Sequence, residues 1–98
     1  MFSVIWTYTV PEPHREAFRE HYCENGSWAR LFTKGEGYLH TEFYQDADHP
    51  ERFLTIDRWR SRQDYDRFFE QHRDLYLDLD KECESLAEDE ELVATLDD

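Results

Sequence analysis

Along three stretches of the chain, large apolar side chains alternate with smaller or polar ones, which is the pattern of a β-strand with two different faces. These stretches are residues 2–10, 38–45 and 53–59. Between and after them, apolar residues recur at steps of three and four in residues 13–32 and 61–86, as on one face of a helix. The short apolar stretch 92–96 predicts a fourth strand at the edge of a sheet.

The first helical segment is predicted to break into two pieces. Pro13 suits the first turn, and Asn25 with Gly26 is typical of a helix C-terminus. Ser27 can then cap a short second piece over residues 28–32. We therefore expect a bend between two short helices in this half of the chain.

The second helix has a clear start, because the hydrophobic period changes from two to about three and a half near residue 60. Ser61 stands at the N-cap position, and Asp64 three residues later completes a shortened capping box. Trp59 is interpreted as a structural plug at this junction. The helix carries the best amphipathic stripe in the chain: Tyr65, Phe68, Phe69, His72, Tyr76, Leu79, Cys83 and Leu86.

Strict alternation assigns the side chains of the second predicted strand to two faces. Leu39 would share a face with Thr41, while Tyr38 would lie on the opposite face with His40 and Glu42. We interpret His40 and Glu42 as a pair at a rim or an interface.

The element order predicts an α+β fold of the ferredoxin-like βαββαβ type, with a four-stranded antiparallel sheet and both helices on one face. Residues 1–98 would form this single domain. The other sheet face would then carry either Leu54 and Ile56 or Phe53 and Trp59, and it would need a second cover. Pairing of two sheets across a twofold axis would bury this face, so we expect a homodimer.

The composition includes an unusually large number of aromatic side chains. Seven Phe, six Tyr and three Trp make 16% of the chain aromatic. Such rings can line a cavity or a partner surface, or they can simply fill a core that is short of Val and Ile. The formal charge of −13 excludes binding to nucleic acids and to anionic membrane surfaces, which both need basic footprints.

No apolar run approaches the length of a membrane span, and residues 1–6 lack the basic region of a signal peptide. We therefore expect a cytoplasmic protein. Cys23 and Cys83 could pair in principle, but without a secretion signal two reduced thiols are expected.

Several segments together resemble the antibiotic biosynthesis monooxygenase-like domain of the dimeric α+β barrel superfamily. They are Trp28-Ala29-Arg30-Leu31-Phe32, Gly37-Tyr38-Leu39, Thr41-Glu42 and the run from Phe53 to Ser61. The resemblance covers nearly the whole chain, and it implies two sheets packed as a dimeric barrel. It leaves the reaction open, because proteins of this layout include cofactor-free oxygenases of polyketide-derived anthrones, haem-degrading enzymes and quinol oxygenases.

In the family that this sequence resembles, the ligand cavity lies between the sheet and the helices. The candidate lining residues here are therefore Trp6, Tyr8, His21, Trp28, His72 and Tyr76. A cofactor-free oxygenation needs a base, a dry pocket and donors for a developing oxyanion. By type and position, His72 is the candidate base, Tyr8 and Tyr76 are candidate donors, and the remaining residues would bind the substrate.

Each candidate has a structural alternative. A single His on an apolar helix face is more often a core-edge residue than a base, and this applies to His72 and His21. Asp57, between Arg58 and Arg60 in sequence, is interpreted as an ion pair or cap, although it would also suit a polar site inside a barrel.

Metal and cofactor sites are not predicted. No spaced pair of His or Cys completes a ligand set around His21 and Cys23. The haem-degrading relatives use an asparagine on the first strand and a tryptophan on the second helix, and both are missing here. Two functions stay open: a cofactor-independent monooxygenase or binding protein for a planar aromatic or quinone-like metabolite, and a non-catalytic homodimeric binding or structural module.

Overall fold

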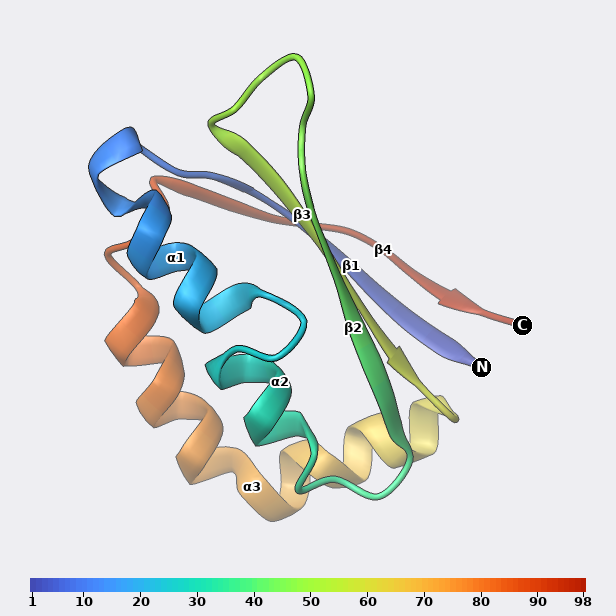
Figure 1. Cartoon of the computed structure of the whole chain (residues 1–98). Helices are drawn as coiled ribbons and strands as arrows, with labels where there is room; N and C mark the ends of the chain where they lie inside the picture. Colours follow the sequence, from blue (N-terminus) through green and yellow to red (C-terminus); the bar gives the residue numbers. More distant parts are fainter.

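The computed structural model describes residues 1–98 and confirms the ferredoxin-like α+β fold. The elements are β1 (Phe2–Thr9), a 3-10 turn η1 (Glu12–His14), α1 (Arg15–Tyr22), α2 (Ser27–Phe32), β2 (Tyr38–Gln45), β3 (Arg52–Trp59), α3 (Arg62–Cys83) and β4 (Asp89–Asp97). The four strands form one antiparallel sheet in the order β2-β3-β1-β4, and the three helices lie together on one side of it (Figure 1).

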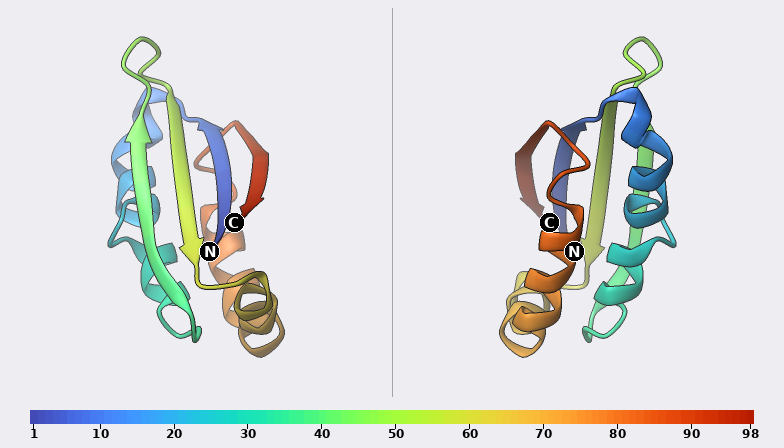
Figure 2. Two further views of the ribbon diagram at one scale, coloured as in Figure 1. Left: turned by 90° about the vertical axis from the view of Figure 1, so that its right-hand side faces the viewer. Right: turned by 90° about the vertical axis from the view of Figure 1, so that its left-hand side faces the viewer.

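The helices settle which face of the sheet is the core face. Phe53 and Trp59 of β3 are completely buried, and they pair across the ladder with Tyr8 and Phe2 of β1, which are also buried. The other face is open and faces the viewer in the left view of Figure 2, with the helices behind the sheet. Because neighbouring strand residues point to opposite faces, Leu54 and Ile56 lie on that open face.

The junction between β3 and α3 forms as predicted at its cap. The Ser61 hydroxyl accepts a hydrogen bond from the Asp64 backbone N–H at 3.1 Å. The carboxylate of Asp64 does not return to the first turn, however. It accepts hydrogen bonds from Arg60 Nε at 3.0 Å and from Arg67 Nη1 at 3.1 Å, so the capping box is only half formed.

The break between α1 and α2 is confirmed, but its cap is not Ser27. The N-cap residue of α2 is Gly26, and Ser27 is the first residue of the helix. A Cβ atom at position 26 would lie 2.7 Å from the carbonyl oxygen of His21, so the close approach of the two helices favours glycine. The Ser27 hydroxyl instead hydrogen-bonds the His21 ring.

The predicted faces of β2 are wrong at the start of the strand. The pairing register shifts between Tyr38 and His40, so Tyr38 lies opposite Trp59 on the core side and Leu39 is 50% exposed. A bulge of this kind inserts one extra residue and reverses the alternation that precedes it. Its consequence is a contact inside the core face, where the Tyr38 hydroxyl lies 2.6 Å from Thr41 Oγ1.

Helix α3 bends at His72, whose backbone angles are φ −126° and ψ 27°. Figure 1 shows its first half under the end of the sheet and its second half running beside α1 and α2. The bend lets one amphipathic stripe face two surfaces: Phe68 packs on Trp59, and Tyr76 packs on Trp28. None of the helices has the length and apolar character needed to span a bilayer.

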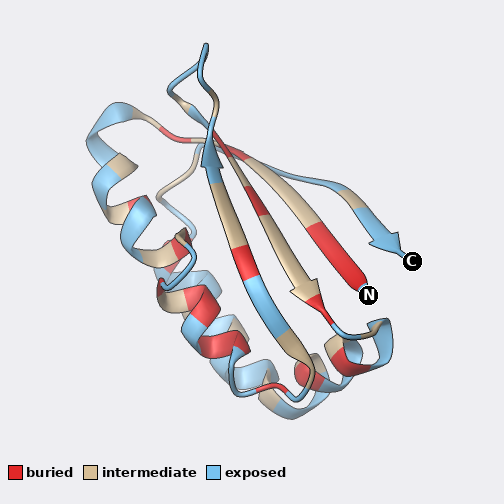
Figure 3. Ribbon diagram, turned by 45° about the vertical axis from the view of Figure 1, so that its right-hand side comes forward, coloured by how far each residue is buried: buried red, intermediate tan, exposed pale blue.

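The predicted edge strand is present and is longer than the sequence pattern indicated. β4 pairs with β1 along its whole length, with a register irregularity opposite Ile5 and Trp6. Figure 3 shows that most of β4 is exposed. The helices therefore leave most of this edge strand uncovered, and Glu90 is its one residue in the lining of the cavity described below.

Candidate functional site

One cavity lies between the core face of the sheet and the helices. Its volume is about 40 Å³, and it is partly open to solvent. Every strand and every α-helix contributes to its lining, which consists of Trp6, Tyr8, Tyr22, Trp28, Phe32, Thr41, Thr55, Asp57, Tyr76, Asp80 and Glu90. An apolar cavity that holds benzene has roughly 150 Å³. The space here accepts a few waters or a small group, and a ring system would require the walls to move apart.

Asp57 is a partly buried carboxylate that lines this cavity. Alternation along β3 puts it on the core face, opposite Val4 of β1 and Thr41 of β2. The Thr41 hydroxyl donates a hydrogen bond to Asp57 Oδ1 at 2.7 Å, and no cation forms an ion pair with the carboxylate. Burial raises the pKa of Asp57 to about 6, and the Thr41 hydrogen bond offsets only part of that effect.

The interpretation of Asp57 as an ion pair or cap is therefore wrong, and the polar-site alternative is the one the structure supports. Arg58 follows Asp57 in sequence but points to the opposite face, where it pairs with Glu42. Arg60 pairs with Asp64 and Glu36 at the start of α3. Sequence neighbours on a strand cannot reach the same side of the sheet.

A short chain of hydroxyl groups orients the carboxylate. Because Thr41 gives its only hydroxyl proton to Asp57, its oxygen accepts the proton of the Tyr38 hydroxyl at 2.6 Å. Thr41 itself is buried. Asp57 Oδ2 has no hydrogen-bond partner within the chain, and Asp57 belongs to the cavity lining.

Tyr8 supplies a second polar group on the cavity floor. Its hydroxyl lies 3.2 Å from Thr55 Oγ1, and the side chain is only 6% exposed. Burial raises the pKa of Tyr8 well above its ordinary value, and the nearby Asp57 charge acts in the same direction. The phenol therefore stays protonated and can donate a hydrogen bond.

The mouth of the cavity is acidic. Asp80 reaches it from α3 and Glu90 from β4, and both residues are exposed. Partial burial and then the charge of Asp80 raise the pKa of Glu90. No Lys, Arg or His belongs to the lining, so nothing in the cavity compensates its three carboxylates.

Four of the six predicted site residues line this cavity. Trp6 and Tyr8 come from β1, Trp28 from α2 and Tyr76 from α3. The rings of Trp28 and Tyr76 meet edge to face at 5.0 Å. The indole Nε1 of Trp28 is buried and makes no hydrogen bond of normal geometry, and Tyr22 and Cys83 are the polar groups next to it.

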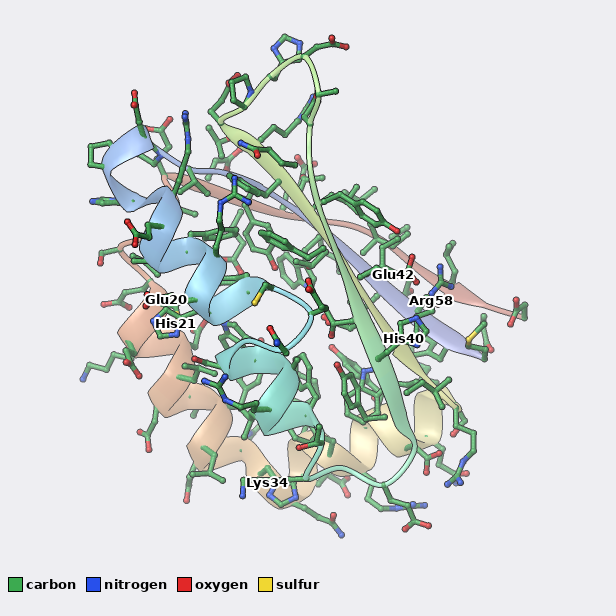
Figure 4. All side chains as sticks on the ribbon, viewed as in Figure 1. Glu20, His21, Lys34, His40, Glu42 and Arg58 are labelled. Carbon is green, nitrogen blue, oxygen red and sulfur yellow. The ribbon has the colours of Figure 1, made fainter.

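The two predicted histidines do not line the cavity. The ring Nδ1 of His21 lies 2.9 Å from Ser27 Oγ, and Figure 4 places His21 on the side of α1 away from the sheet. His72 sits at the bend of α3, where its ring packs against Phe68 at 5.3 Å. It borders only a shallow surface hollow made by residues 70–75 of its own helix.

Sequence reasoning did not select several lining residues: Tyr22, Phe32, Thr41, Thr55, Asp80 and Glu90. The threonines carry a signal that could have been used. Thr55 and Asp57 share one face of β3 with Phe53 and Trp59, and polar groups on a face that also carries large rings need partners when that face is covered. The two acids at the mouth carried no such signal, because they lie among many other acids near the C-terminus.

The open face of the sheet holds a separate polar network. Glu42 accepts hydrogen bonds from Arg58 Nε and, at 2.9 Å, from the Tyr44 hydroxyl, and the His40 ring lies 3.2 Å away. The Arg58 guanidinium and these hydrogen bonds lower the pKa of Glu42 to about 2. Figure 4 places His40, Glu42 and Arg58 on the side of the sheet away from the helices, so this network belongs to a different surface.

Neither the cysteines nor any acidic cluster forms a second reactive centre. Cys23 and Cys83 are free thiols. Cys83 is buried, and burial raises its pKa to about 11, so the thiol stays protonated and is a poor nucleophile. No group of three or more His, Cys, Asp or Glu side chains is arranged to hold a metal ion.

A ferredoxin-like sheet with its helices on one face, and a small aromatic cavity between them that holds a partly buried carboxylate, define an α+β domain with one candidate ligand site. Comparison with known protein families identifies the family to which this domain belongs. The antibiotic biosynthesis monooxygenase family model matches residues 1–73, and the chain belongs to this family.

Solved structures share the fold at low sequence identity. SnoaB, a cofactor-independent oxygenase from Streptomyces nogalater solved as a variant, has a TM-score of 0.74 at 14% identity, over 99% of this chain and 91% of that chain. A Deinococcus radiodurans protein assigned as an antibiotic biosynthesis monooxygenase has a TM-score of 0.73 at 15% identity, over 100% of this chain and 92% of that chain. Rv0793 from Mycobacterium tuberculosis has a TM-score of 0.66 at 20% identity, over 99% of this chain and 96% of that chain. No curated protein matches the chain.

Proposed function

We propose that this protein is a cofactor-independent monooxygenase that acts on a planar aromatic or quinone-like metabolite, with Asp57 as the base. The observation that carries the proposal is a carboxylate in an aromatic cavity with a pKa raised to about 6 and no cation beside it. A base of this kind is ionised at neutral pH and is more basic than an ordinary carboxylate. The oxygenase named among the structural relatives adds support.

In the proposed reaction, the free oxygen of Asp57 removes one of the two protons of an activated CH₂ group of the substrate. The resulting carbanion passes one electron to O₂, and the two radicals combine to a peroxide anion. Asp57 returns the proton to give a hydroperoxide, which loses water and leaves a carbonyl group. One oxygen atom thus enters the product and the other leaves as water.

The other lining residues would hold the substrate and its developing charge. Tyr8 stays protonated and can donate to an oxyanion. Tyr76 is likewise kept protonated, because burial raises its pKa. Trp6 and Trp28 offer ring faces on which a planar substrate can stack.

His72 is not included in this proposal, because it lies outside the cavity and a base must reach the proton that it removes. The two assignments lead to opposite expectations. Oxygen uptake with a panel of anthrones and hydroquinones should fall about 100-fold or more in Asp57→Asn and stay near the wild-type rate in His72→Ala. Uptake that survives in Asp57→Asn but is lost in His72→Ala would contradict the proposal.

The small volume of the cavity favours a second candidate, a non-catalytic binding module whose rings fill their own core. In that case the wild-type protein would consume no oxygen with any member of the panel. The substrate panel therefore separates the two functions before any variant is made.

We also propose that the protein is a homodimer that pairs through the open sheet face. This face carries Ile5, Leu54 and Ile56 in its centre and the exposed Leu96 and Tyr44 toward its edges. A contiguous apolar surface of this kind is rare on a monomer. A second copy would cover it and would enclose the network around Glu42 and Arg58.

A further inference from the structure

Tyr38 and Thr41 share a face of the sheet only because β2 is irregular between them. On a regular strand, residues three positions apart point to opposite faces. The register shift between Tyr38 and His40 adds one residue to β2, so Tyr38 and Thr41 both lie on the core face. The extra residue thus brings the Tyr38 hydroxyl within 2.6 Å of Thr41 Oγ1. Bulges are frequent beside active sites, where they re-aim a side chain.

Packing holds the ring of Tyr38 in this place. It meets the buried ring of Trp59 edge to face at 5.3 Å and the buried ring of Phe32 at 5.7 Å. The preceding residue is also fixed, because the Gly37 carbonyl accepts a hydrogen bond from the Arg60 N–H at 2.7 Å. Tyr38 does not belong to the cavity lining, so it can act on a ligand only through another residue.

The ionised carboxylate of Asp57 sets the direction of the two hydrogen bonds. A carboxylate can only accept, so the Thr41 hydroxyl donates to Asp57 Oδ1 at 2.7 Å and accepts from the Tyr38 hydroxyl. A donor on the Thr41 oxygen polarises the Thr41 O–H and strengthens the bond to Asp57. It also disfavours rotation of the Thr41 hydroxyl toward Tyr38, because two protons would then face each other.

We propose that Tyr38 is a positioning residue for Asp57, which acts through Thr41 and does not touch the substrate. Its hydroxyl holds the Thr41 hydroxyl on Oδ1 and stabilises the ionised carboxylate, while Oδ2 has no partner within the chain. The inference rests on the proposed function, in which Asp57 is the base, and it adds a residue from outside the cavity. Removal of the Tyr38 hydroxyl therefore makes Asp57 harder to ionise.

The ionisation of Asp57 can be followed without turnover, by ¹³C NMR of its side-chain carboxyl, with Asp57→Asn to assign the signal. Tyr38→Phe keeps the ring and removes the hydroxyl, and it should raise the titration midpoint of Asp57 by about 0.5 pH unit. Thr41→Val removes the direct hydrogen bond and should raise the midpoint by about one pH unit or more.

A double variant shows whether the effect of Tyr38 passes through Thr41. In the Thr41→Val background, Tyr38→Phe should move the midpoint by less than about 0.2 pH unit, because the connecting hydroxyl is gone. Tyr44→Phe is the matched control, since it removes a hydroxyl of the same strand that donates to Glu42 on the open face. The control should keep the wild-type midpoint, and circular dichroism checks that every variant folds.

The other titratable groups around Asp57 are the same in all of these proteins. They are Tyr8 of β1, Tyr22 of α1, Tyr65, Tyr76 and Asp80 of α3, and Glu90 of β4. Burial raises the pKa of each of these four tyrosines, so their hydroxyls stay protonated throughout the titration. A difference between variants therefore reports the chain of hydroxyl groups.

The inference would be overturned by an Asp57 midpoint in Tyr38→Phe that stays within about 0.2 pH unit of the wild type; Asp57 could still be the base. It would also be overturned by an undiminished effect of Tyr38→Phe in the Thr41→Val background, or by an equal shift in Tyr44→Phe. If the midpoints shift as expected but the wild-type protein consumes no oxygen with any substrate, the positioning role stands and only the proposed reaction fails.

Discussion

At the scale of single residues, Asp57 is a partly buried carboxylate on the core face of the sheet, and no cation pairs with it. Its hydrogen bond from Thr41 offsets only part of the cost of burial. A natural protein keeps such a group where it has a function, since removing the charge would stabilise the fold. The effect of Asp57 on the free energy of unfolding can therefore be measured, in addition to its effect on oxygen uptake.

The raised pKa predicts how Asp57 affects stability. The folded-state pKa of about 6 exceeds the ordinary 3.8, so the contribution of Asp57 is fully present below about pH 4 and is lost as the pH rises through 6. We expect Asp57→Asn to raise the free energy of unfolding at pH 7.5 by up to about 3 kcal/mol, and to lose this advantage near pH 4. Urea denaturation at both pH values measures it.

The exposed Asp78→Asn is the control for that comparison, and it should change stability by less than about 0.5 kcal/mol at either pH. A destabilised Asp57→Asn at pH 7.5 would mean that the charged carboxylate is well compensated in the fold. The pKa argument for a base would then fail.

The site was only partly predictable at this scale. Alternation put Trp6 and Tyr8 on the same face of the first strand, and the family resemblance put the cavity between the sheet and the helix stripe of Tyr76; all three residues line the cavity. His72 shares that stripe, but the bend of α3 at His72 itself points the two halves of the helix at different surfaces. Apolar residues at steps of three and four residues mark one face of a straight helix, so this pattern could not exclude His72 from the cavity.

At the scale of elements, the turn between α2 and β2 is tied to the start of α3. Gly37 has φ +92°, a conformation that residues with a side chain rarely adopt. A Cβ atom there would lie 2.3 Å from Asp64 Oδ2, in the cap region of α3. The backbone also joins the two elements, because Arg60 N–H donates to the Gly37 carbonyl at 2.7 Å.

Gly37→Ala should therefore lower the free energy of unfolding by about 2 kcal/mol or more, through the strained backbone and the displaced Asp64. The exposed Lys34→Ala in the same connection should change it by less than about 0.5 kcal/mol. Thermal unfolding of the two variants gives the comparison. An unchanged midpoint in Gly37→Ala would show that the turn can adopt another path.

The cap of α3 provides a second element-scale prediction. Ser61→Ala removes the acceptor for the Asp64 N–H and should cost about 1 kcal/mol in urea denaturation. Ser61→Asp should retain most of the stability, because an aspartate oxygen can accept the same bond. Equal losses in both variants would contradict the capping role.

Element boundaries followed from the sequence where local chemistry decides them, and failed where pairing decides them. Ser61 caps α3 because its hydroxyl acts within four residues. The bulge after Tyr38 depends on the register with β3, and the cap at Gly26 depends on how closely α1 approaches α2. Neither contact can be read from a local pattern.

At the scale of the whole molecule, the helices cover one face of the sheet and leave Leu54 and Ile56 on the other (Figure 2). The element order and the alternation were sufficient to predict this architecture. They could not decide which of the two faces of β3 is covered, because both carry large apolar residues.

Sedimentation should give a mass of about twice the 12.0 kDa of the chain at micromolar concentration. Ile56→Glu should produce a monomer, because it places a charge in the centre of the open face. Leu75→Glu is the matched control: Leu75 is exposed on α3, away from that face, so this variant should remain dimeric. A monomeric wild-type protein would contradict the proposed pairing.

The pH dependence of oxygen uptake tests the central claim most directly, because it combines the position of Asp57 with its pKa. With an anthrone substrate, and after subtraction of the uncatalysed rate at each pH, the wild-type rate should rise through a midpoint near pH 6 and then level off. Below this midpoint Asp57 is protonated and cannot accept a proton. Asp57→Asn should lack the transition and be slower by about 100-fold or more on the plateau. The account would be contradicted by an Asp57→Asn variant that keeps both the rate and the pH profile of the wild type.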